Sequence, residues 1–427
     1  MKVAVIGLGY VGLPLSLYLA KKVSVIGFDL NKKKIKSLKN KIDLNKEANV
    51  EMFKKAKNII FSSDEVQLKN QDIYIIAVPT PVDKKNKPDL SLLLLATKTV
   101  AKYIKNQSIV IIESTVYPGT TEEICAPLLE KISKLKFLKD NCNSNDIGFY
   151  CGFCPERVNP GDRKHKLSKI TKVISGSSGE AIARIKTLYK IVNGNNIYIA
   201  PSIKVAEAAK IIENTQRDLN ISLVNEFSKI FSLMKIDTND VLKTAGTKWN
   251  FLKFKPGLVG GHCIGVDPYY LTYKSQQLNY KPKIILAGRK INNSMANYVF
   301  NKLNFYYRKK NIKNKIKKCL VIGVSFKENV PDIRNSKALE LVNILKKNQH
   351  KVDIYDPVVN EKKIMNCKIF KKISEIKKNQ YDSIILAVPH SNFIKILKKN
   401  INSIIKTNSV FFDLKGIFSK EFSDFRL

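Results

Sequence analysis

The chain has 427 residues, of which 44% are hydrophobic, 26% charged and 9% aromatic. This length suffices for two or three domains with their own cores, and the composition excludes disordered, collagen-like and disulfide-framework proteins. The seven cysteines are odd in number and lack repeated metal-ligand spacing, which favours reduced thiols in a cytoplasmic protein without a metal site.

The chain is strongly basic, with 75 Lys and Arg against 36 Asp and Glu and a formal net charge of +39. Such a charge can indicate a nucleic-acid or membrane partner. Only eight of the basic residues are Arg, however, and the lysines run along the whole chain instead of gathering with aromatic residues in one patch. We therefore expect no nucleic-acid and no membrane partner, while a small polyanionic substrate is compatible with the charge.

The uncharged stretch 3–20 is long enough to be mistaken for a membrane span or signal peptide. Three glycines and Pro14 interrupt it at turn spacing, and a strand-like segment follows directly at 23–28. We therefore predict a soluble, cytoplasmic protein.

Short apolar runs alternate with helix-length amphipathic segments in the first half, which predicts a parallel sheet covered by helices. The predicted strands are residues 3–6, 23–28, 73–78 and 109–112. Long helices are predicted from Pro201 to about Ser232 and from about 284 to 307. The apolar stripe predicted for the first of these consists of Val205, Ala208, Ile211, Ile212, Thr215, Leu219, Ser222 and Leu223.

The alternation returns after a basic connector. Strands are predicted at 319–323, 351–355, 384–388 and 410–414, with a helix at 336–347. A strand–helix–strand unit followed by an acidic residue thus occurs at both ends of the chain. We predict an α/β fold in which two Rossmann-like, doubly wound domains are joined by a central helical domain.

The first predicted strand runs into Gly7-Leu8-Gly9-Tyr10-Val11-Gly12 and then a helix, and Asp29 ends the next strand. The first glycine permits a tight turn, the second lets a pyrophosphate approach the backbone, and the third lets the helix pack on the strand. Asp29 would accept hydrogen bonds from a ribose diol and repel a 2′-phosphate, which favours NAD over NADP. A tight turn in a protein that binds no dinucleotide is the alternative.

Three further residues are candidates for cofactor contact because they follow later strands of the same sheet. They are Pro79, Thr80 and Thr115. Ligands of doubly wound sheets bind at this carboxyl edge. The second Rossmann-like domain has only Gly323 at the corresponding turn, so we expect it to bind no second NAD.

The segment from Gly257 to Pro268 places four glycines around one thiol. Cys263 is a candidate nucleophile whose thiolate attacks an aldehyde, with Asp267 as a candidate acid–base or water-positioning group. The alternative is a small cysteine buried in a tight turn. His262 is a candidate base, loop residue or substrate contact. The other six cysteines, including the C-x-x-C pair at 151 and 154, are interpreted as structural.

Lys210 and Asn214 lie four residues apart on the first long helix and share a face. An ammonium and an amide at this spacing can point at one developing oxyanion. The alternative is a pair of polar surface residues.

Taken together, these motifs resemble the nucleotide-sugar 6-dehydrogenases, the UDP-glucose and GDP-mannose dehydrogenase family, from end to end. The resemblance rests on residues 3–14, Pro79-Thr80-Pro81, Ser114-Thr115-Val116, Pro155-Glu156-Arg157, residues 210–214, the Cys263 loop, Ser325-Phe326-Lys327 and Asp332-Ile333-Arg334. Within the family, residues 156–162 and 248–252 and the His262-bearing loop look like the branch that acts on UDP-N-acetylhexosamines.

The resemblance implies an NAD-dependent, four-electron oxidation of the sugar's C6 alcohol to a carboxylate, for surface polysaccharide synthesis. By analogy, Lys210 and Asp267 would assist deprotonation of the alcohol and later position water. Cys263 would form a thiohemiacetal and then a thioester. Lys210 and Asn214 would hold the oxyanion, Glu156 would help to activate water, and Thr115 would act through water or cofactor contacts.

The resemblance also implies a set of substrate contacts, a domain plan and an oligomer. The substrate contacts are Glu156, Arg157, Asn159, Lys210, Asn214, Lys253, Gly260, His262, Arg289, Lys327 and Arg334. Residues 1–200 would bind NAD, residues 201–310 would form the central helical domain with the cysteine loop and the dimer interface, and residues 311–427 would bind the UDP-sugar. We expect a homodimer or a higher homo-oligomer.

Other functions are compatible with parts of this pattern. UDP-glucose and GDP-mannose 6-dehydrogenases are the alternatives within the family. A two-electron dehydrogenase acting on a 2-hydroxy acid or a 3-hydroxyacyl substrate would use the dinucleotide domain but give Cys263 no task. A nucleic-acid-associated NAD-binding protein is the non-enzymatic alternative, and only the net charge of +39 favours it.

Overall fold

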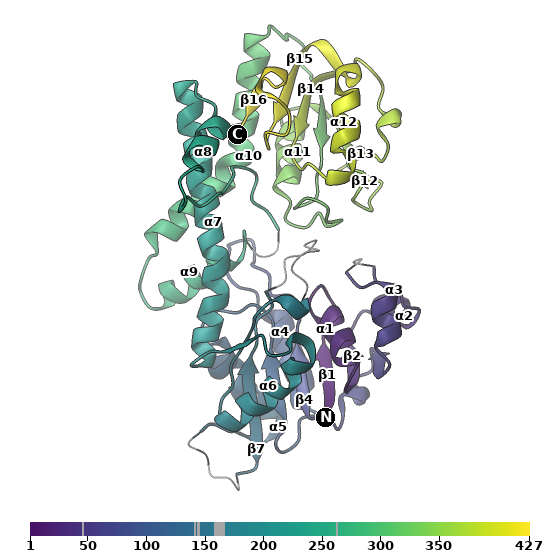
Figure 1. The fold of residues 1–427 in the computed structure, drawn as a ribbon, viewed down its shortest axis with the longest axis vertical. Helices are drawn as coiled ribbons and strands as arrows, with labels where there is room; N and C mark the ends of the chain where they lie inside the picture. The colour runs from purple at the N-terminus through teal and green to yellow at the C-terminus, as the bar shows by residue number, and fades with distance from the viewer. Residues whose placement is uncertain (45–46, 141, 143–145, 158–166, 262–263) are drawn as a thin grey trace. The chain divides into compact units, whose positions relative to one another are not determined.

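The computed structural model describes residues 1–44, 47–140, 142, 146–157, 167–261 and 264–427. These residues form two compact units, one of residues 1–213 with 269–280 and one of residues 214–268 with 281–427. Within the described residues, each unit contains a seven-stranded sheet (Figure 1).

The sheet of the first unit has the strand order β3-β2-β1-β4-β5-β7-β6, and its paired strands are parallel. The strands are β1 Lys2–Ile6, β2 Ser24–Phe28, β3 Ile59–Ser62, β4 Ile73–Ile76, β5 Ile109–Ile112, β6 Lys136–Phe137 and β7 Gly148–Phe153, and β8 Lys172–Ile174 pairs with β9 Ile197–Ile199 in a small separate sheet. The order reverses between β1 and β4, which makes their carboxyl ends the expected ligand crevice.

Helices cover both faces of this sheet because successive residues of a buried strand point to opposite faces. The helices are α1 Gly12–Leu19, α2 Lys32–Lys39, α3 Val50–Lys55, α4 Ser91–Ala101, α5 Ala126–Ser133 and α6 Gly179–Asn193. Apolar residues of α1, α2, α3 and α6 pack on one face. The other face is covered by α4, α5 and the first turns of α7 (Ile203–Met234).

The second unit has a similar plan, with the strand order β12-β13-β11-β10-β14-β15-β16, in which the edge strand β12 pairs antiparallel with β13 and the other paired strands are parallel. The strands are β10 Lys318–Ile322, β11 Lys351–Tyr355, β12 Lys363–Ile364, β13 Cys367–Phe370, β14 Tyr381–Leu386, β15 Ile405–Asp413 and β16 Phe425–Arg426. Helices α10 (Lys283–Lys309) and α11 (Lys337–Lys347) pack on one face and α12 (Ser391–Ile404) on the other. Two further helices are α8 (Thr238–Ala245) and α9 (Asp267–Gln277).

The predicted α/β class with two doubly wound parallel sheets and a helical connection is therefore confirmed. The predicted strands 109–112 and 351–355 match β5 and β11, and the other predicted strands lie within three residues of the observed ones, except that β15 begins five residues before the predicted strand 410–414. Among the described residues, no helix has both the length and the apolar composition needed to cross a bilayer.

The predicted apolar stripe of α7 is wrong in part. Val205, Ile212 and Leu223 belong to the predicted stripe, yet they are 47%, 54% and 47% exposed. The buried face of α7 is largely polar and consists of Ile203, Ala206, Glu207, Lys210, Ile211, Thr215, Asp218, Ser222, Val224, Asn225 and Ser228. Tertiary hydrogen bonds of Glu207, Asp218 and Asn225 offset part of the cost of burying this polar face, a contribution that hydrophobic periodicity does not register.

Glu207 is one of these buried polar groups and is completely buried. Its carboxylate accepts the backbone N–H groups of Gly119 at 2.6 Å and Thr121 at 2.9 Å. Burial raises the pKa of Glu207 to about 7, although these hydrogen bonds oppose the shift. The contact ties α7 to the segment that follows Thr115.

This raised pKa predicts a loss of stability with rising pH. The folded state binds a proton at Glu207 that the unfolded chain has already lost, so stability falls between about pH 4.5 and pH 7. In Glu207→Gln the fall in unfolding free energy from pH 5 to pH 8 should be smaller by up to about 3 kcal/mol. Urea unfolding at both pH values measures this difference, with Glu226→Gln on the exposed side of α7 as the control. Equal falls in both variants would contradict the prediction.

Candidate active site

The three glycines after β1 have different surroundings. Gly7 has a φ of +93°, and a Cβ on Gly12 would lie 1.9 Å from the carbonyl oxygen of Gly7. These two positions therefore require glycine for the turn and for the packing of α1. A Cβ on Gly9 would meet no described atom within 4 Å. The space beside Gly9 fits the approach of a pyrophosphate, as the fingerprint requires. Tyr10 and Val11 complete this turn before α1 and are half-buried.

Asp29 follows β2 and faces the same turn. One carboxylate oxygen accepts the N–H of Leu8 at 3.0 Å and the ammonium of Lys34 at 2.7 Å, and the other accepts the N–H of Asn31 at 2.9 Å. The side chain of Asp29 remains 12% exposed. A ribose diol can therefore reach this carboxylate at the edge of the sheet, so the residues present fit NAD.

The loops after β4 and β5 are bonded to each other. The hydroxyl of Thr80 donates to the carbonyl of Thr115 at 2.7 Å, and the hydroxyl of Ser114 donates to the carbonyl of Val78 at 2.7 Å. Tyr270 of α9 donates its hydroxyl to the carbonyl of Thr80 at 2.7 Å. Pro79, next to Thr80, is exposed. These bonds place Thr80 and Thr115 together at the carboxyl edge.

The loop after β7 brings Glu156 and Arg157 to this edge and connects them to α7. Arg157 forms an ion pair with Glu213 at 2.6 Å and donates to the carbonyl of Thr171 at 3.2 Å. Glu156 accepts the N–H of Arg157 at 2.6 Å. Lys210 of α7 is 8% exposed. Asn159 lies outside the described residues.

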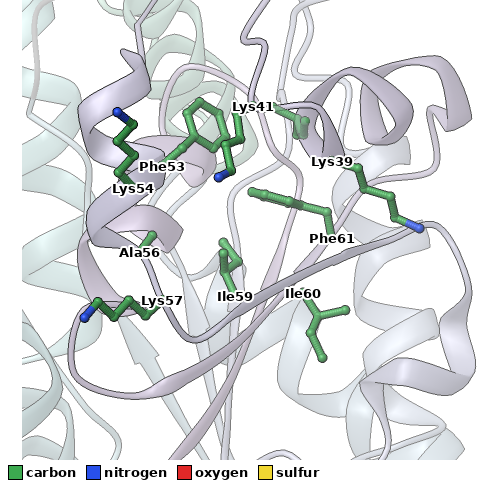
Figure 2. A pocket seen from close by; sticks show the side chains of 10 residues that line it. Lys39, Lys41, Phe53, Lys54, Ala56, Lys57, Ile59, Ile60 and Phe61 are labelled. Atoms are coloured by element: carbon green, nitrogen blue, oxygen red, sulfur yellow. The ribbon is translucent and has the colours of Figure 1, made fainter.

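A separate pocket of about 570 Å³ lies at the β3 side of this sheet. Figure 2 shows the rings of Phe53 and Phe61 among the side chains that line it, and their centroids lie 6.2 Å apart. The residues that line it are Leu38, Lys39, Lys41, Phe53, Lys54, Ala56, Lys57, Ile59, Ile60 and Phe61. It contains none of the predicted site residues.

In the second unit, Asn214 donates its side-chain amide to the carboxylate of Asp267 at 2.6 Å. Asp267 is the first residue of α9 and is 2% exposed. Both residues were predicted to be catalytic, and the structure brings them together. His262 and Cys263 lie outside the described residues.

Gly260 and Gly261, which precede Cys263 in the sequence, pack against the segment 326–337. A Cβ on Gly260 would lie 2.4 Å from the carbonyl oxygen of Asn335, and a Cβ on Gly261 would lie 2.5 Å from the ring of Phe326. The amide of Asn335 donates to the carbonyl of Gly261 at 2.8 Å. The two glycines thus allow a close approach to the backbone at Asn335 and to the ring of Phe326.

Arg289 is 3% exposed and donates to the carboxylate of Asp218 at 2.6 Å. Asn292 donates to the same carboxylate and accepts from Asn225, which exchanges hydrogen bonds with both backbone groups of Gly257. This buried network positions the start of the cysteine loop. Arg289 therefore takes part in an internal network, and its contact with the substrate stays a prediction.

The predicted nucleotide contacts lie after β10. Arg334 forms a two-pronged ion pair with Asp332, its closest contact being 2.6 Å, and is 58% exposed. Lys327 is half-buried, and its carbonyl accepts the hydroxyl of Ser325 at 2.8 Å. Lys253, in the loop before the glycines, is exposed. Asp332 fixes the plane of the Arg334 guanidinium, an arrangement suited to a phosphate or a carboxylate.

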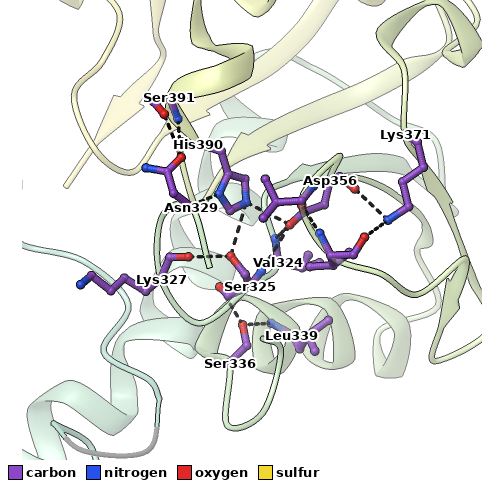
Figure 3. A network of polar contacts seen from close by, with 12 residues as sticks. Val324, Ser325, Lys327, Asn329, Ser336, Leu339, Asp356, Lys371, His390 and Ser391 are labelled. Carbon is purple, nitrogen blue, oxygen red and sulfur yellow. Dashed lines mark hydrogen bonds and ion pairs between the residues drawn. The ribbon is translucent and has the colours of Figure 1, made fainter. Parts of the chain in front are cut away.

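A buried network fixes the Ser325–Lys327 turn (Figure 3). The carboxylate of Asp356, after β11, accepts the N–H of Val324 at 2.8 Å and that of Val358 at 2.9 Å, and contacts Nε2 of His390 at 3.2 Å. Burial alone would raise the pKa of Asp356, but the contacts with His390 and the backbone hold it below its usual value. Asp356 is completely buried. The acid that corresponds to Asp29 is thus used internally and does not face a ribose.

The chain is similar to known proteins along its whole length. The NAD-binding, central and UDP-binding domain models of the UDP-glucose/GDP-mannose dehydrogenase family match residues 1–193, 204–294 and 320–420. UDP-N-acetyl-D-glucosamine 6-dehydrogenase from Salmonella typhi is 48% identical over the whole chain and 99% of its own length. The chain belongs to the UDP-glucose/GDP-mannose dehydrogenase family.

Two further relatives support the same membership. The enzyme of the same name from Pseudomonas aeruginosa is 46% identical, over all of this chain and 99% of that one. The structure of UDP-D-ManNAc dehydrogenase from Pyrococcus horikoshii aligns with a TM-score of 0.88 and 30% identity, covering 98% of this chain and 96% of that one. The protein is therefore an NAD-dependent nucleotide-sugar dehydrogenase.

Sequence reasoning missed several residues of this dehydrogenase site. Lys415, after β15, lies against Gly257, and burial together with nearby Lys255 lowers its pKa although Glu328 opposes this. Asn335 and Asn225 hold the glycine loop at its two ends. Asn335 directly follows the Asp332-Ile333-Arg334 motif, so the motif could have pointed to it. No sequence motif or spacing indicates that Lys415 or Asn225 contacts the loop.

The glycine contacts predict different effects for two similar substitutions. Gly12→Ala should lower the unfolding free energy by about 1–3 kcal/mol, because its Cβ collides with the backbone of Gly7. Gly9→Ala should change stability by less than about 0.5 kcal/mol but weaken NAD binding at least about tenfold, because the methyl group occupies the pyrophosphate space. Urea unfolding and calorimetric titration with NAD measure the two effects. Wild-type NAD affinity in Gly9→Ala would contradict the assignment.

Proposed function

We propose that this dehydrogenase oxidises the C6 alcohol of a UDP-N-acetylhexosamine, UDP-GlcNAc or UDP-GalNAc, to the uronate. The hydrogen bond between Asn214 and Asp267 carries the proposal, because it joins the predicted oxyanion-holding helix to the residue four positions after Cys263. The names of the two relatives with 46–48% identity support an N-acetylhexosamine as the sugar.

The first oxidation removes a proton and a hydride from the alcohol. Lys210 and Asp267 would take up and stabilise the charge that develops at the oxygen as its proton leaves. NAD, when bound, accepts the hydride in each oxidation. Asn214 would donate to the same oxygen while its other contact holds Asp267 in place. A free aldehyde would hydrate or escape, so the next step must retain it.

Cys263 would retain the aldehyde by adding its thiolate to the carbonyl carbon, forming a thiohemiacetal. Loss of the second hydride leaves a thioester. Water then adds to the thioester carbonyl while Glu156 accepts its proton, and the carbon–sulfur bond breaks to release the carboxylate and the thiolate. Thr115 would contact the cofactor or the water. The net reaction consumes one water and two NAD for each sugar.

The second unit would hold the nucleotide diphosphate through Lys327 and Arg334. Lys253 would contribute a further positive charge, and Lys415 would do so beside the glycine loop. The product is a nucleotide-activated sugar acid, the form of substrate that a glycosyltransferase consumes. We propose that it supplies surface polysaccharide synthesis from the cytoplasm.

The substrate assignment predicts a defined stoichiometry. With limiting sugar and excess NAD, UDP-GlcNAc or UDP-GalNAc should give two NADH per sugar, measured by absorbance. UDP-ManNAc, UDP-glucose and GDP-mannose should react with kcat/KM at least about tenfold lower. A yield of one NADH per sugar would refute the covalent mechanism, and a preference for UDP-glucose or GDP-mannose would refute the proposed substrate.

Cys263→Ala tests the role of the sulfur, and Cys142→Ala, which removes a partly buried thiol elsewhere in the chain, is the control. Cys263→Ala should bind NAD normally but form no uronate, whereas Cys142→Ala should match the wild type. A simple two-electron dehydrogenase would lose little activity in either variant.

We also propose a homodimer through the second half of α7. Leu223, Ile230, Leu233 and Met234 lie on this half and are 45–80% exposed. Trp249, the only tryptophan, is 92% exposed in the loop after α8. Exposed apolar groups in this number are typical of an interaction surface.

The proposed interface predicts that the wild type has a dimeric or larger mass in light scattering. Ile230→Asp with Leu233→Asp should give a monomer, because burying two carboxylates is unfavourable. The fluorescence of Trp249 should shift to longer wavelength in that monomer if the loop joins the interface. A monomeric wild type would remove the proposal.

A further inference from the structure

A completely buried ion pair lies next to the loop that carries Glu156. Lys172 begins β8 and Glu113 follows β5, and they are only 4% and 3% exposed. The ammonium of Lys172 lies 2.6 Å from one carboxylate oxygen of Glu113. Tyr189 of α6 donates its hydroxyl to the same oxygen. Neither Lys172 nor Glu113 was among the predicted site residues.

The other two N–H groups of the Lys172 ammonium donate to backbone carbonyls. Its ammonium donates to the carbonyl of Cys154 at 2.9 Å and to that of Pro155 at 3.2 Å. An ammonium has three N–H donors, so these two bonds and the one to Glu113 satisfy it completely. The two carbonyls belong to the residues directly before Glu156. Lys172 thus fixes the backbone from which the Glu156 side chain projects.

The pair also reaches the neighbouring loop through the chain. Glu113 is directly followed by Ser114 and Thr115, whose hydrogen bonds to Val78 and Thr80 join the loops after β4 and β5. One buried contact therefore connects the ends of β5 and β7 at the carboxyl edge. A shift of the ammonium would displace both ends.

The charges of this group are coupled to that of Glu156. Burial disfavours the charged form of Lys172, but the carboxylates of Glu113 and Glu156 outweigh burial and raise its pKa. Burial raises the pKa of Glu113. A buried ion pair adds little to stability compared with apolar residues of the same volume. Stability alone therefore does not explain why this ion pair lies beside the proposed water-activating residue, and we infer that it serves the reaction.

We propose that Lys172 is a positioning residue for hydrolysis of the thioester. Its ammonium fixes the Cys154–Pro155 backbone and attracts the Glu156 carboxylate, so that this carboxylate accepts a proton from the attacking water. The water oxygen bonds to the carbonyl carbon, the carbon–sulfur bond breaks, and the sulfur leaves as thiolate. This inference rests on the proposed function.

The test uses the full-length protein with NAD and the sugar that the wild type oxidises. In Lys172→Met the first turnover should release two NADH per subunit at a rate within about threefold of the wild type, since both hydrides leave before hydrolysis. Steady-state turnover should then fall about 100-fold, the scale expected for a misplaced catalytic group. Intact-mass measurement of the quenched variant should show the sugar nucleotide attached to the peptide that contains Cys263.

A second variant separates positioning from folding. Lys172→Met leaves the carboxylate of Glu113 buried, whereas Lys172→Met with Glu113→Gln removes both charges and should fold with a Tm close to that of the wild type. It should show the same burst, slow turnover and adduct. Arg426→Met is the matched control, because it breaks another ion pair with low exposure, to Asp237, and should leave the ratio of burst to steady-state rate unchanged.

Each outcome decides the proposal. Wild-type steady-state turnover in either Lys172 variant would overturn it. So would an equal loss of burst and steady-state rates, or a failure of both variants to fold, because the pair would then be only structural. An absence of NADH production by the wild type with any sugar would instead refute the proposed function.

Discussion

The carboxyl edge of a parallel sheet is the constraint on which the rest of this protein depends. The carboxyl ends of parallel strands lie at the same edge of the sheet, so residues that follow different strands are close in space although they are distant in sequence. Gly9, Asp29, Thr80, Thr115 and Glu156 follow β1, β2, β4, β5 and β7 and share that edge. The buried ion pair of Lys172 with Glu113 connects the ends of β5 and β7. The positions of Thr115 and Glu156 at this edge therefore depend on a contact in the protein interior.

The two units show how one plan can serve two purposes. Asp29 and Asp356 both follow the second strand of their sheet, and both accept a backbone N–H from the turn after the first strand. The side chain of Asp29 remains 12% exposed, whereas Asp356 is completely buried and contacts four backbone N–H groups and His390. The same residue type at the same place is thus partly exposed at the carboxyl edge of one sheet and holds the backbone of a turn in the other.

Eight strands (β1, β2, β4, β5, β10, β11, β14 and β15), the glycine turn after β1 and the place of Asp29 at the end of β2 could be predicted, because apolar runs and glycine spacing are local properties of the chain. The contacts that position the site could not. The residues of the pair Lys172–Glu113 are 59 positions apart, and the buried polar face of α7 contradicts the apolar stripe expected from helical periodicity. Glu207 and Asp218 are buried with hydrogen-bond partners on other elements, and one sequence does not reveal those partners.

A crystal structure of the protein with NAD tests the central claim most directly. We expect the pyrophosphate against the backbone at Gly9, the adenine ribose hydroxyls within hydrogen-bond distance of Asp29, and the nicotinamide beside Thr115. Cofactor bound at the carboxyl edge of the second sheet, or in the lysine-rimmed pocket by Phe53 and Phe61, would contradict the account.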